Sequence, residues 1–126
     1  MSGEIKKILL IDDEEVILFG FKQVLMEPWL QVDTASTAGE AKALSEKNVY
    51  CAAIVDMRLS SSTAMEGLDL IPLLKTMQKN CRIIVLTAYG DEVIRRKAFN
   101  FGADLFLEKP VDPETLKKNL AALGIE

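Results

Sequence analysis

The chain has 126 residues, 49% of them hydrophobic, which suits one compact domain over residues 1–126 and leaves too little chain for two domains of ordinary size. Its formal net charge of −4 argues against the basic face that nonspecific nucleic-acid binding requires, so we expect no direct contact with DNA. The sequence shows neither a secretory signal pattern nor an apolar run of about 20 residues that could span a bilayer. We therefore expect a cytoplasmic protein without membrane contact.

The two cysteines, Cys51 and Cys81, each precede an apolar run. They lack a CxxC spacing and the chain contains no histidine, which argues against a zinc site. We expect both to be small buried thiols.

Short apolar runs alternate five times with segments of helical period. This alternation predicts an α/β fold in which the runs form one parallel sheet covered by helices. The strands are expected at residues 7–11, 32–35, 51–55, 82–86 and 105–108. Residues 51–55 are apolar throughout, which favours a central place in the sheet.

The first helix is expected to end before Pro28 and to have a broad apolar face. That face contains Val16, Ile17, Phe19, Phe21, Val24 and Leu25. The second helix follows Ser36-Thr37, a hydroxyl pair that predicts an N-cap.

The third helix is expected to begin at Gly67 or Leu68, and Pro72 is compatible with it only near the first turn. The fourth runs from Asp91 to a stop at Gly102. The fifth begins at Pro113 and ends at Leu123, and its expected N-cap is Asp112.

Four of the apolar runs stop at residues that can handle phosphate or a metal ion. These are Asp12-Asp13, Asp56, Thr87 and Lys109. Because the carboxyl ends of parallel strands share one edge, where ligands of open α/β sheets bind, we expect these side chains to meet there.

The charges at this edge predict a metal. Asp12, Asp13 and Asp56 would repel one another, and Lys109 alone leaves the local charge negative. A divalent cation resolves that conflict, and hard oxygen ligands completed by water suit Mg²⁺. With Mg²⁺ in place, the Asp56 carboxylate could attack a phosphoryl group, while Thr87 could hydrogen-bond a phosphoryl oxygen.

Each residue also has an ordinary structural interpretation. Asp12 or Asp13 could cap the first helix, Asp56 could end a strand in a turn, Thr87 could be an N-cap-like hydroxyl, and Lys109 could be solvated. All of these would have to hold at four strand ends in the right order, so a shared site is the preferred hypothesis.

Four motifs follow one another along almost the whole chain: ILLIDDE at 8–14, IVDMRL at 54–59, VLTAY at 85–89 and GADLFLEKP at 102–110. As an ordered set they resemble the receiver domains of two-component response regulators. The resemblance implies a doubly wound, flavodoxin-like (CheY-like) sheet of five parallel strands in the order 2-1-3-4-5, with five helices.

The same resemblance implies the site roles. Asp56 would be the phosphoacceptor, taking a phosphoryl group from a histidine kinase or a histidine phosphotransfer protein. Asp12, Asp13, Asp56 and the backbone carbonyl of Arg58 would hold Mg²⁺, and Lys109 would pair with the phosphoryl group or with Asp56. The domain would assist its own phosphorylation and dephosphorylation without being an enzyme.

Thr87 and Phe106 would form the switch pair, in which the hydroxyl moves toward the phosphoryl group and the ring turns inward. The family also often has a cis peptide before the proline of its Lys-Pro pair, here Lys109–Pro110.

Two features near Asp56 bear on the lifetime of the phosphoryl group. Arg58 and Tyr89 stand where, by resemblance, side chains influence the access of water, and their large size predicts slow hydrolysis. The Ser60–Glu66 segment is about three residues longer than usual for the family and is expected to tune access to the aspartate.

Phosphorylation would be read through the fourth helix, fifth strand and fifth helix, a face that is also a candidate homodimer contact. Phe101 either widens an exposed apolar patch there or folds into the core. A stand-alone receiver, a phosphorelay intermediate and the N-terminal piece of a larger regulator all remain open, and the downstream partner is not identified.

Two other classes are less favoured. A haloacid-dehalogenase-like, Mg²⁺-dependent aspartyl phosphatase normally carries a second aspartate where Arg58 stands. A nucleotide- or flavin-binding domain needs a glycine- or hydroxyl-rich loop, and residues 12–15 are all acidic here.

Overall fold

The computed structural model describes residues 5–56, 66–88 and 92–125. Within these residues, five strands alternate with five helices. The elements are β1 (Lys6–Ile11), α1 (Glu15–Leu25), β2 (Leu30–Ala35), α2 (Ala38–Lys47), β3 (Ala52–Asp56), α3 (Glu66–Met77), β4 (Arg82–Thr87), α4 (Glu92–Phe101), β5 (Leu105–Glu108) and α5 (Pro113–Ala122).

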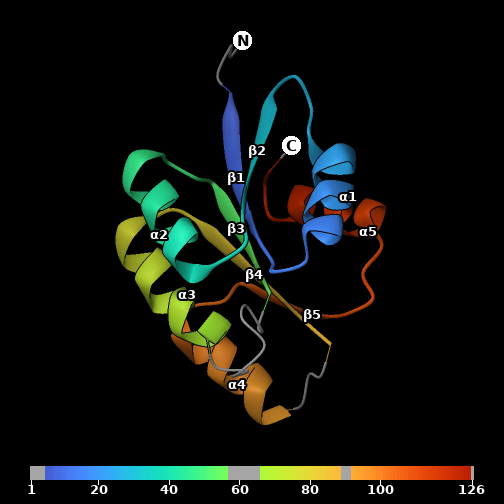
Figure 1. The fold of residues 1–126 in the computed structure, drawn as a ribbon. Helices are drawn as coiled ribbons and strands as arrows, with labels where there is room; N and C mark the ends of the chain where they lie inside the picture. Colours follow the sequence, from blue (N-terminus) through green and yellow to red (C-terminus); the bar gives the residue numbers. More distant parts are fainter. Residues whose placement is uncertain (1–4, 57–65, 89–91, 126) are drawn as a thin grey trace.

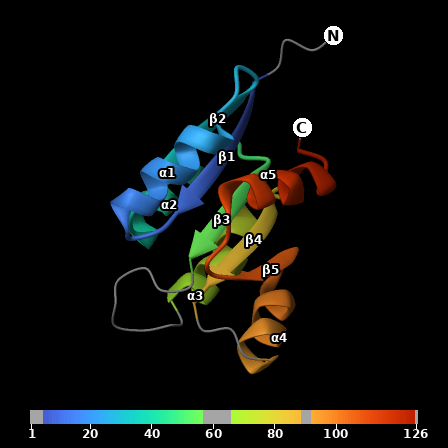
Figure 2. The ribbon, with the colours of Figure 1, turned by 90° about the vertical axis from the view of Figure 1, so that its right-hand side faces the viewer.

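The strands form one parallel sheet in the order β2-β1-β3-β4-β5, which confirms the expected topology. Helices α1 and α5 cover one face of the sheet, and α2, α3 and α4 cover the other (Figure 1). In the view turned by 90°, β1, β3 and β4 run toward the same edge (Figure 2). All five carboxyl ends therefore lie on one side of the domain.

Strand β3 is buried at every position, as expected for a central strand. Its side chains alternate between two core clusters because successive residues of a strand point to opposite faces. Ala53 and Val55 pack toward α2, α3 and α4, and Ile54 packs toward α1 and α5. Two apolar layers thus hold the strand ends in fixed positions.

The predicted apolar face of α1 is too broad. Val16 is 83% exposed and Phe19 is 67% exposed, whereas Leu18, Phe21 and Leu25 are buried. The buried residues repeat at spacings of three and four, which places them on one narrow stripe of the helix. At 100° per residue, Val16 points to the opposite side and faces solvent.

The expectation for Pro72 is also wrong. Helix α3 begins at Glu66, so Pro72 is an internal residue rather than part of the first turn. Its side chain is exposed, and its ring therefore displaces no core atoms. Since proline has no N–H, the helix forgoes one internal hydrogen bond there.

The three predicted helix ends are confirmed. Thr37 Oγ1 accepts a hydrogen bond from the Glu40 N–H at 3.0 Å, and Gly102 follows α4 with φ of +119°. Asp112 does occupy the N-cap position of α5, but its side chain makes no capping hydrogen bond. Pro113 is the first helical residue, where its missing N–H costs no internal hydrogen bond.

The expectation for the cysteines is half right. Cys81 is buried, as expected, whereas Cys51 is only partly buried. Cys51 lies before the first residue of β3, Ala52, although the strand was expected to begin at residue 51. Burial raises the pKa of the Cys81 thiol to about 12.

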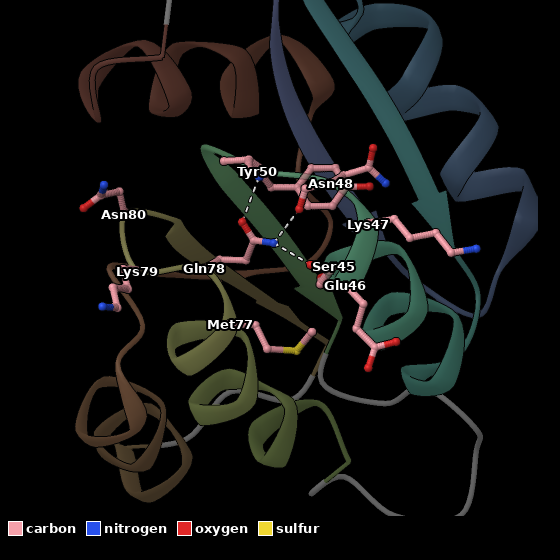
Figure 3. Close-up of a pocket in the computed structure, with 10 residues that line it drawn as sticks. Ser45, Glu46, Lys47, Asn48, Tyr50, Met77, Gln78, Lys79 and Asn80 are labelled. Carbon is pink, nitrogen blue, oxygen red and sulfur yellow. Dashed lines mark hydrogen bonds between the residues drawn. The ribbon is translucent and has the colours of Figure 1, made fainter.

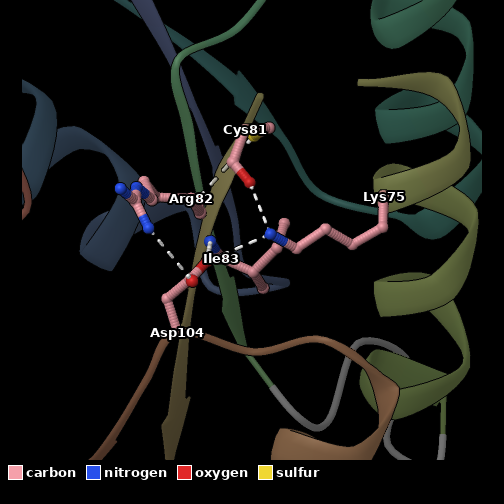
Figure 4. Close-up of polar contacts among 5 residues, drawn as sticks. All are labelled: Lys75, Cys81, Arg82, Ile83 and Asp104. Carbon is pink, nitrogen blue, oxygen red and sulfur yellow. Dashed lines mark hydrogen bonds and ion pairs between the residues drawn. The ribbon is translucent and has the colours of Figure 1, made fainter. Parts of the chain in front are cut away.

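Asp104 joins α3, β4 and β5 at the edge where the strands begin (Figure 4). It accepts hydrogen bonds from the Ile83 N–H at 2.8 Å and from Lys75 Nζ at 3.1 Å, and Arg82 approaches to 3.5 Å. Burial works to raise the pKa of this carboxyl, but the Ile83 N–H and Lys75 outweigh it and hold the pKa below its usual 3.8.

We expect Asp104→Asn to make the protein less sensitive to acid. A carboxyl with a lowered pKa contributes stability that is present above its unfolded pKa and is lost as the pH falls through the folded value. Denaturant unfolding between about pH 5 and about pH 2 should therefore show a shallower loss of free energy in the variant. The exposed Asp69→Asn is the matched control, and equal slopes for Asp104→Asn and wild type would contradict the assignment.

None of the helices in the described parts of the chain combines the length and hydrophobicity needed to cross a bilayer.

Candidate functional site

The polar residues predicted at the strand ends do come together. Asp12 and Asp13 follow β1, Asp56 ends β3, Thr87 ends β4 and Lys109 follows β5. Main-chain hydrogen bonds fix this edge, because the Lys109 N–H donates to the Thr87 carbonyl at 2.7 Å and the Asp12 N–H donates to the Ala35 carbonyl at 3.1 Å.

Three carboxylates converge at the centre of the edge. Asp12, Asp13 and Asp56 each offer an oxygen, and these oxygens all lie within 4.8 Å of one another. Asp12 and Asp56 are buried, whereas Asp13 is exposed. Like charges at this separation repel, most strongly where water is excluded, so the cluster attracts a cation.

Lys109 supplies one positive charge between the two buried carboxylates. Its ammonium lies 3.2 Å from Asp12 Oδ2 and 3.2 Å from Asp56 Oδ1. Burial works to lower the pKa of Lys109, but the carboxylates of Asp56 and Asp12 outweigh it, and the pKa is raised above its usual 10.5. Lys109 therefore remains an ammonium at neutral pH and ties β5 to β1 and β3.

The raised pKa of Lys109 has a consequence at high pH. Its ion pairs contribute stability that is fully present below the unfolded pKa and is lost as the pH rises through the folded pKa. Between about pH 10 and about pH 12, we expect wild type to lose more unfolding free energy than Lys109→Gln. Chemical denaturation across this range checks the prediction, and parallel curves for the two proteins would count against these ion pairs.

The residues fit a divalent cation. Three carboxylates and one ammonium leave a local charge of −2, which one such ion neutralises. All the ligand atoms are hard oxygens, and Asp13 opens the cluster to solvent, so water can complete the coordination. The backbone carbonyl of Arg58, the remaining predicted ligand, lies outside the described residues.

The predicted switch residues occupy adjacent strands. Thr87 is buried at the end of β4, and Phe106 pairs with Val85 in the sheet. The Phe106 ring is partly buried and packs against the core cluster shared with α3 and α4. The peptide bond between Lys109 and Pro110 is cis, as the resemblance implied.

Two of the remaining predictions concern residues near Asp56, and one concerns α4. Tyr89 and residues 60–65 lie outside the described residues. Phe101 is 37% exposed, which contradicts its interpretation as a core residue.

One contact that the sequence did not indicate helps to hold the site. The Glu14 N–H donates to Asp12 Oδ1 at 2.9 Å, which orients the carboxylate within the turn after β1. Any residue other than proline could supply that donor, so no residue type signals it.

The comparison that decides the family is a match over residues 8–121 to the model described as the response regulator receiver domain. The chain belongs to this family. Its motifs, topology and cluster of strand-end side chains thus have a common explanation in the receiver domains of two-component response regulators.

Individual relatives and solved structures agree with this assignment. The photosynthetic apparatus regulatory protein RegA of Cereibacter sphaeroides is 32% identical over 97% of this chain, which covers 65% of RegA. A CheY-like receiver domain protein from Methanospirillum hungatei is 31% identical, with a TM-score of 0.87 over 95% of this chain and 94% of that one. A response regulator from Burkholderia pseudomallei, solved with a phosphorylated aspartic acid, a calcium ion and citrate, is 29% identical with a TM-score of 0.81 over 94% of this chain and 72% of that one.

Proposed function

We propose that residues 1–126 form one receiver domain in which Asp56 accepts a phosphoryl group from a histidine kinase or a histidine phosphotransfer protein. The observation that carries this proposal is the Lys109 ammonium placed 3.2 Å from Asp56 Oδ1, inside a cluster of three carboxylates. An aspartate that merely ended a strand in a turn would need neither the Lys109 ammonium nor the carboxylates of Asp12 and Asp13 beside it. The phosphorylated aspartic acid of the Burkholderia pseudomallei regulator supports it.

Mg²⁺ is the proposed metal, held by Asp12, Asp13 and Asp56 with the Arg58 carbonyl. When bound, it would neutralise charge on the oxygens of the transferring phosphoryl group. The structure of the Burkholderia pseudomallei regulator holds a calcium ion. Calcium, like magnesium, is a hard divalent cation that prefers oxygen ligands.

The side chains of this chain would perform the transfer. An Asp56 oxygen forms a bond to phosphorus while the bond from phosphorus to the donor's nitrogen breaks, which leaves an acyl phosphate on the aspartate. Lys109 then exchanges its contact with the Asp56 carboxylate for one with a phosphoryl oxygen. No covalent bond to the lysine forms, so its part is to hold positive charge where negative charge accumulates.

The switch and the output surface follow from the same site. The Thr87 hydroxyl would bond a phosphoryl oxygen, and Phe106 would move inward into the space that this motion opens. The change would reach the face formed by α4, β5 and α5, where Val93 is 62% exposed and Phe99 37%. That face would bind a downstream protein or a second copy of the chain.

We propose two possible positions for the domain in a signalling pathway. The chain covers 65% of RegA, and an N-terminal receiver within a longer regulator is therefore one proposal for its context. A phosphorelay intermediate is the other, in which Asp56 would pass the phosphoryl group on to a histidine. The cytoplasmic location remains a prediction.

Mg²⁺ should stabilise the wild-type protein, and Asp12→Asn should abolish most of that gain. A ligand that binds only the folded state adds about 2.7 kcal/mol at 100 times its dissociation constant, so a shift of several degrees in Tm is expected. Thermal unfolding with Mg²⁺ and with a chelator measures it. Asp69→Asn, the same change on the exposed side of α3, should behave as wild type; an equal Mg²⁺ shift in Asp12→Asn would argue against the proposed ligands.

A further inference from the structure

A second group of charged residues lies at the edge where the strands begin. Arg82 starts β4 and Thr87 ends it, so this edge is roughly 17 Å from the phosphoacceptor edge. A hollow of ≈ 300 Å³ lies beside the turn between α3 and β4. It is lined by Lys75, Lys79, Asn80, Cys81 and Arg82.

Two of the three cations in this hollow are held in place by a carboxylate. Asp104 lies between Lys75 and Arg82, with 3.1 Å to the ammonium and 3.5 Å to the guanidinium (Figure 4). Lys75 also donates to the Cys81 carbonyl at 2.8 Å. The Lys75 stem passes close to Gly102, where a Cβ would lie 3.0 Å from Lys75 Cγ. The hollow is therefore bordered by positioned cations.

Hydrogen bonds of the Gln78 side chain anchor the turn that carries Lys79, the third cation. The Gln78 side chain accepts from the Tyr50 N–H at 2.9 Å and donates to the carbonyls of Ser45 at 2.9 Å and Asn48 at 2.7 Å (Figure 3). The Cys81 N–H closes the turn on the Gln78 carbonyl at 3.1 Å. Lys79 and Asn80 occupy the two central positions of the turn and are exposed. Their polar side chains make no hydrogen bond to another described residue.

The charge around the hollow is opposite to that of the chain as a whole. Lys75, Lys79 and Arg82 against Asp104 leave a local charge of +2, whereas the chain carries −4. The C-terminus of α3 opposes an anion here, but a helix end at an exposed site contributes only about 0.3–1 kcal/mol. The attraction of three nearby cations for an anion is larger than this unfavourable contribution from the helix end.

The lining also indicates what kind of anion fits. Arginine presents a planar fork to phosphate and lysine a point charge, whereas the hollow has no aromatic ring on which a base could stack. A second hollow of ≈ 370 Å³ shares Lys79 and Asn80 with the first, but its lining includes the Glu46 carboxylate, which repels an anion, and Tyr50. We propose that this edge binds a compact, ring-free anion with two or more phosphate groups, held by Lys75, Lys79 and Arg82.

Neither hollow includes Asp12, Asp56 or Lys109 in its lining. An anion bound at this edge therefore does not compete with the phosphoacceptor, and the proposal stands apart from the function of Asp56.

Isothermal titration calorimetry of the whole chain with inorganic pyrophosphate and with tripolyphosphate, without Mg²⁺, tests the site. The double variant Lys79→Ala with Arg82→Ala should bind at least about tenfold more weakly, because each charge-assisted hydrogen bond is worth roughly a factor of ten. The control, Lys42→Ala with Lys118→Ala, removes the same charge from exposed positions on α2 and α5 and should change binding less than about twofold.

Several results would overturn the proposal. Equal weakening in the two double variants would show attraction by net charge alone, and no heat at low millimolar pyrophosphate would show that there is no site. Tighter binding of adenosine monophosphate than of pyrophosphate would reject the ring-free ligand. The single variant Lys79→Ala should also weaken binding. It should fold normally, because the Lys79 side chain makes no hydrogen bond to another described residue, so weaker binding by this variant cannot be caused by misfolding.

Discussion

Asp56→Asn should abolish stable phosphorylation of this protein, lowering the rate of phosphoryl incorporation by roughly 10³-fold or more. The amide cannot act as the anionic nucleophile, although it has nearly the same size and occupies the same buried position at the end of β3. The substitution also removes one of the three carboxylates that would hold the metal. Incorporation from a small phosphodonor in the presence of Mg²⁺ measures the effect.

Two controls make this result specific. Asp69→Asn makes the same chemical change on an exposed part of α3 and should leave incorporation as in wild type. Thermal unfolding of Asp56→Asn should remain a single cooperative transition, since removal of one of several crowded carboxylates relieves repulsion. Incorporation by Asp56→Asn at the wild-type rate would contradict the proposed role of Asp56 as phosphoacceptor.

Ile54→Ala should destabilise the folded protein strongly, at a cost of about 3–4 kcal/mol. Ile54 is fully buried in the central strand and packs toward α1 and α5. Neighbouring strands on both sides limit how far the structure can close around the missing atoms, so a cavity remains. For a domain of this size, that cost corresponds to a fall in Tm of roughly 10–15 °C.

Ile5→Ala is the matched control because the side chain lost is identical and Ile5 is 60% exposed. Its free energy of unfolding should change by no more than about 0.5 kcal/mol. Urea denaturation of both variants gives the comparison. A cost below about 1 kcal/mol for Ile54→Ala would mean that the sheet repacks more freely than a parallel sheet covered on both faces should.

The sheet and its functional edge were largely predictable from local sequence. Strands that are buried on both faces appear in the sequence as continuous apolar runs, which are easy to identify. The polar residue that ends each strand follows its run directly in the sequence. The parallel arrangement then brings Asp12, Asp56 and Lys109 together although they are far apart in the chain. Strand order came from the family resemblance, because periodicity says which segments are strands but not which ones pair.

The wrong predictions share a physical cause, since they depend on orientation or on contacts distant in sequence. Val16 and Phe19 are apolar, but the angle of α1 on the sheet decides which stripe is buried. Asp104 and its partners from α3 and β4 were missed because no local pattern joins a lysine, an arginine and an aspartate from three segments.

The most direct test of the central claim is to identify the residue that carries the phosphoryl group. Wild-type protein would be phosphorylated with and without Mg²⁺, trapped by chemical reduction of the acyl phosphate and mapped by peptide mass spectrometry. The result expected is a single modified residue, Asp56, in the Mg²⁺ sample and almost none without the metal. Modification of Asp12, Asp13 or a hydroxyl side chain instead, or equal modification of Asp56 without Mg²⁺, would contradict the account.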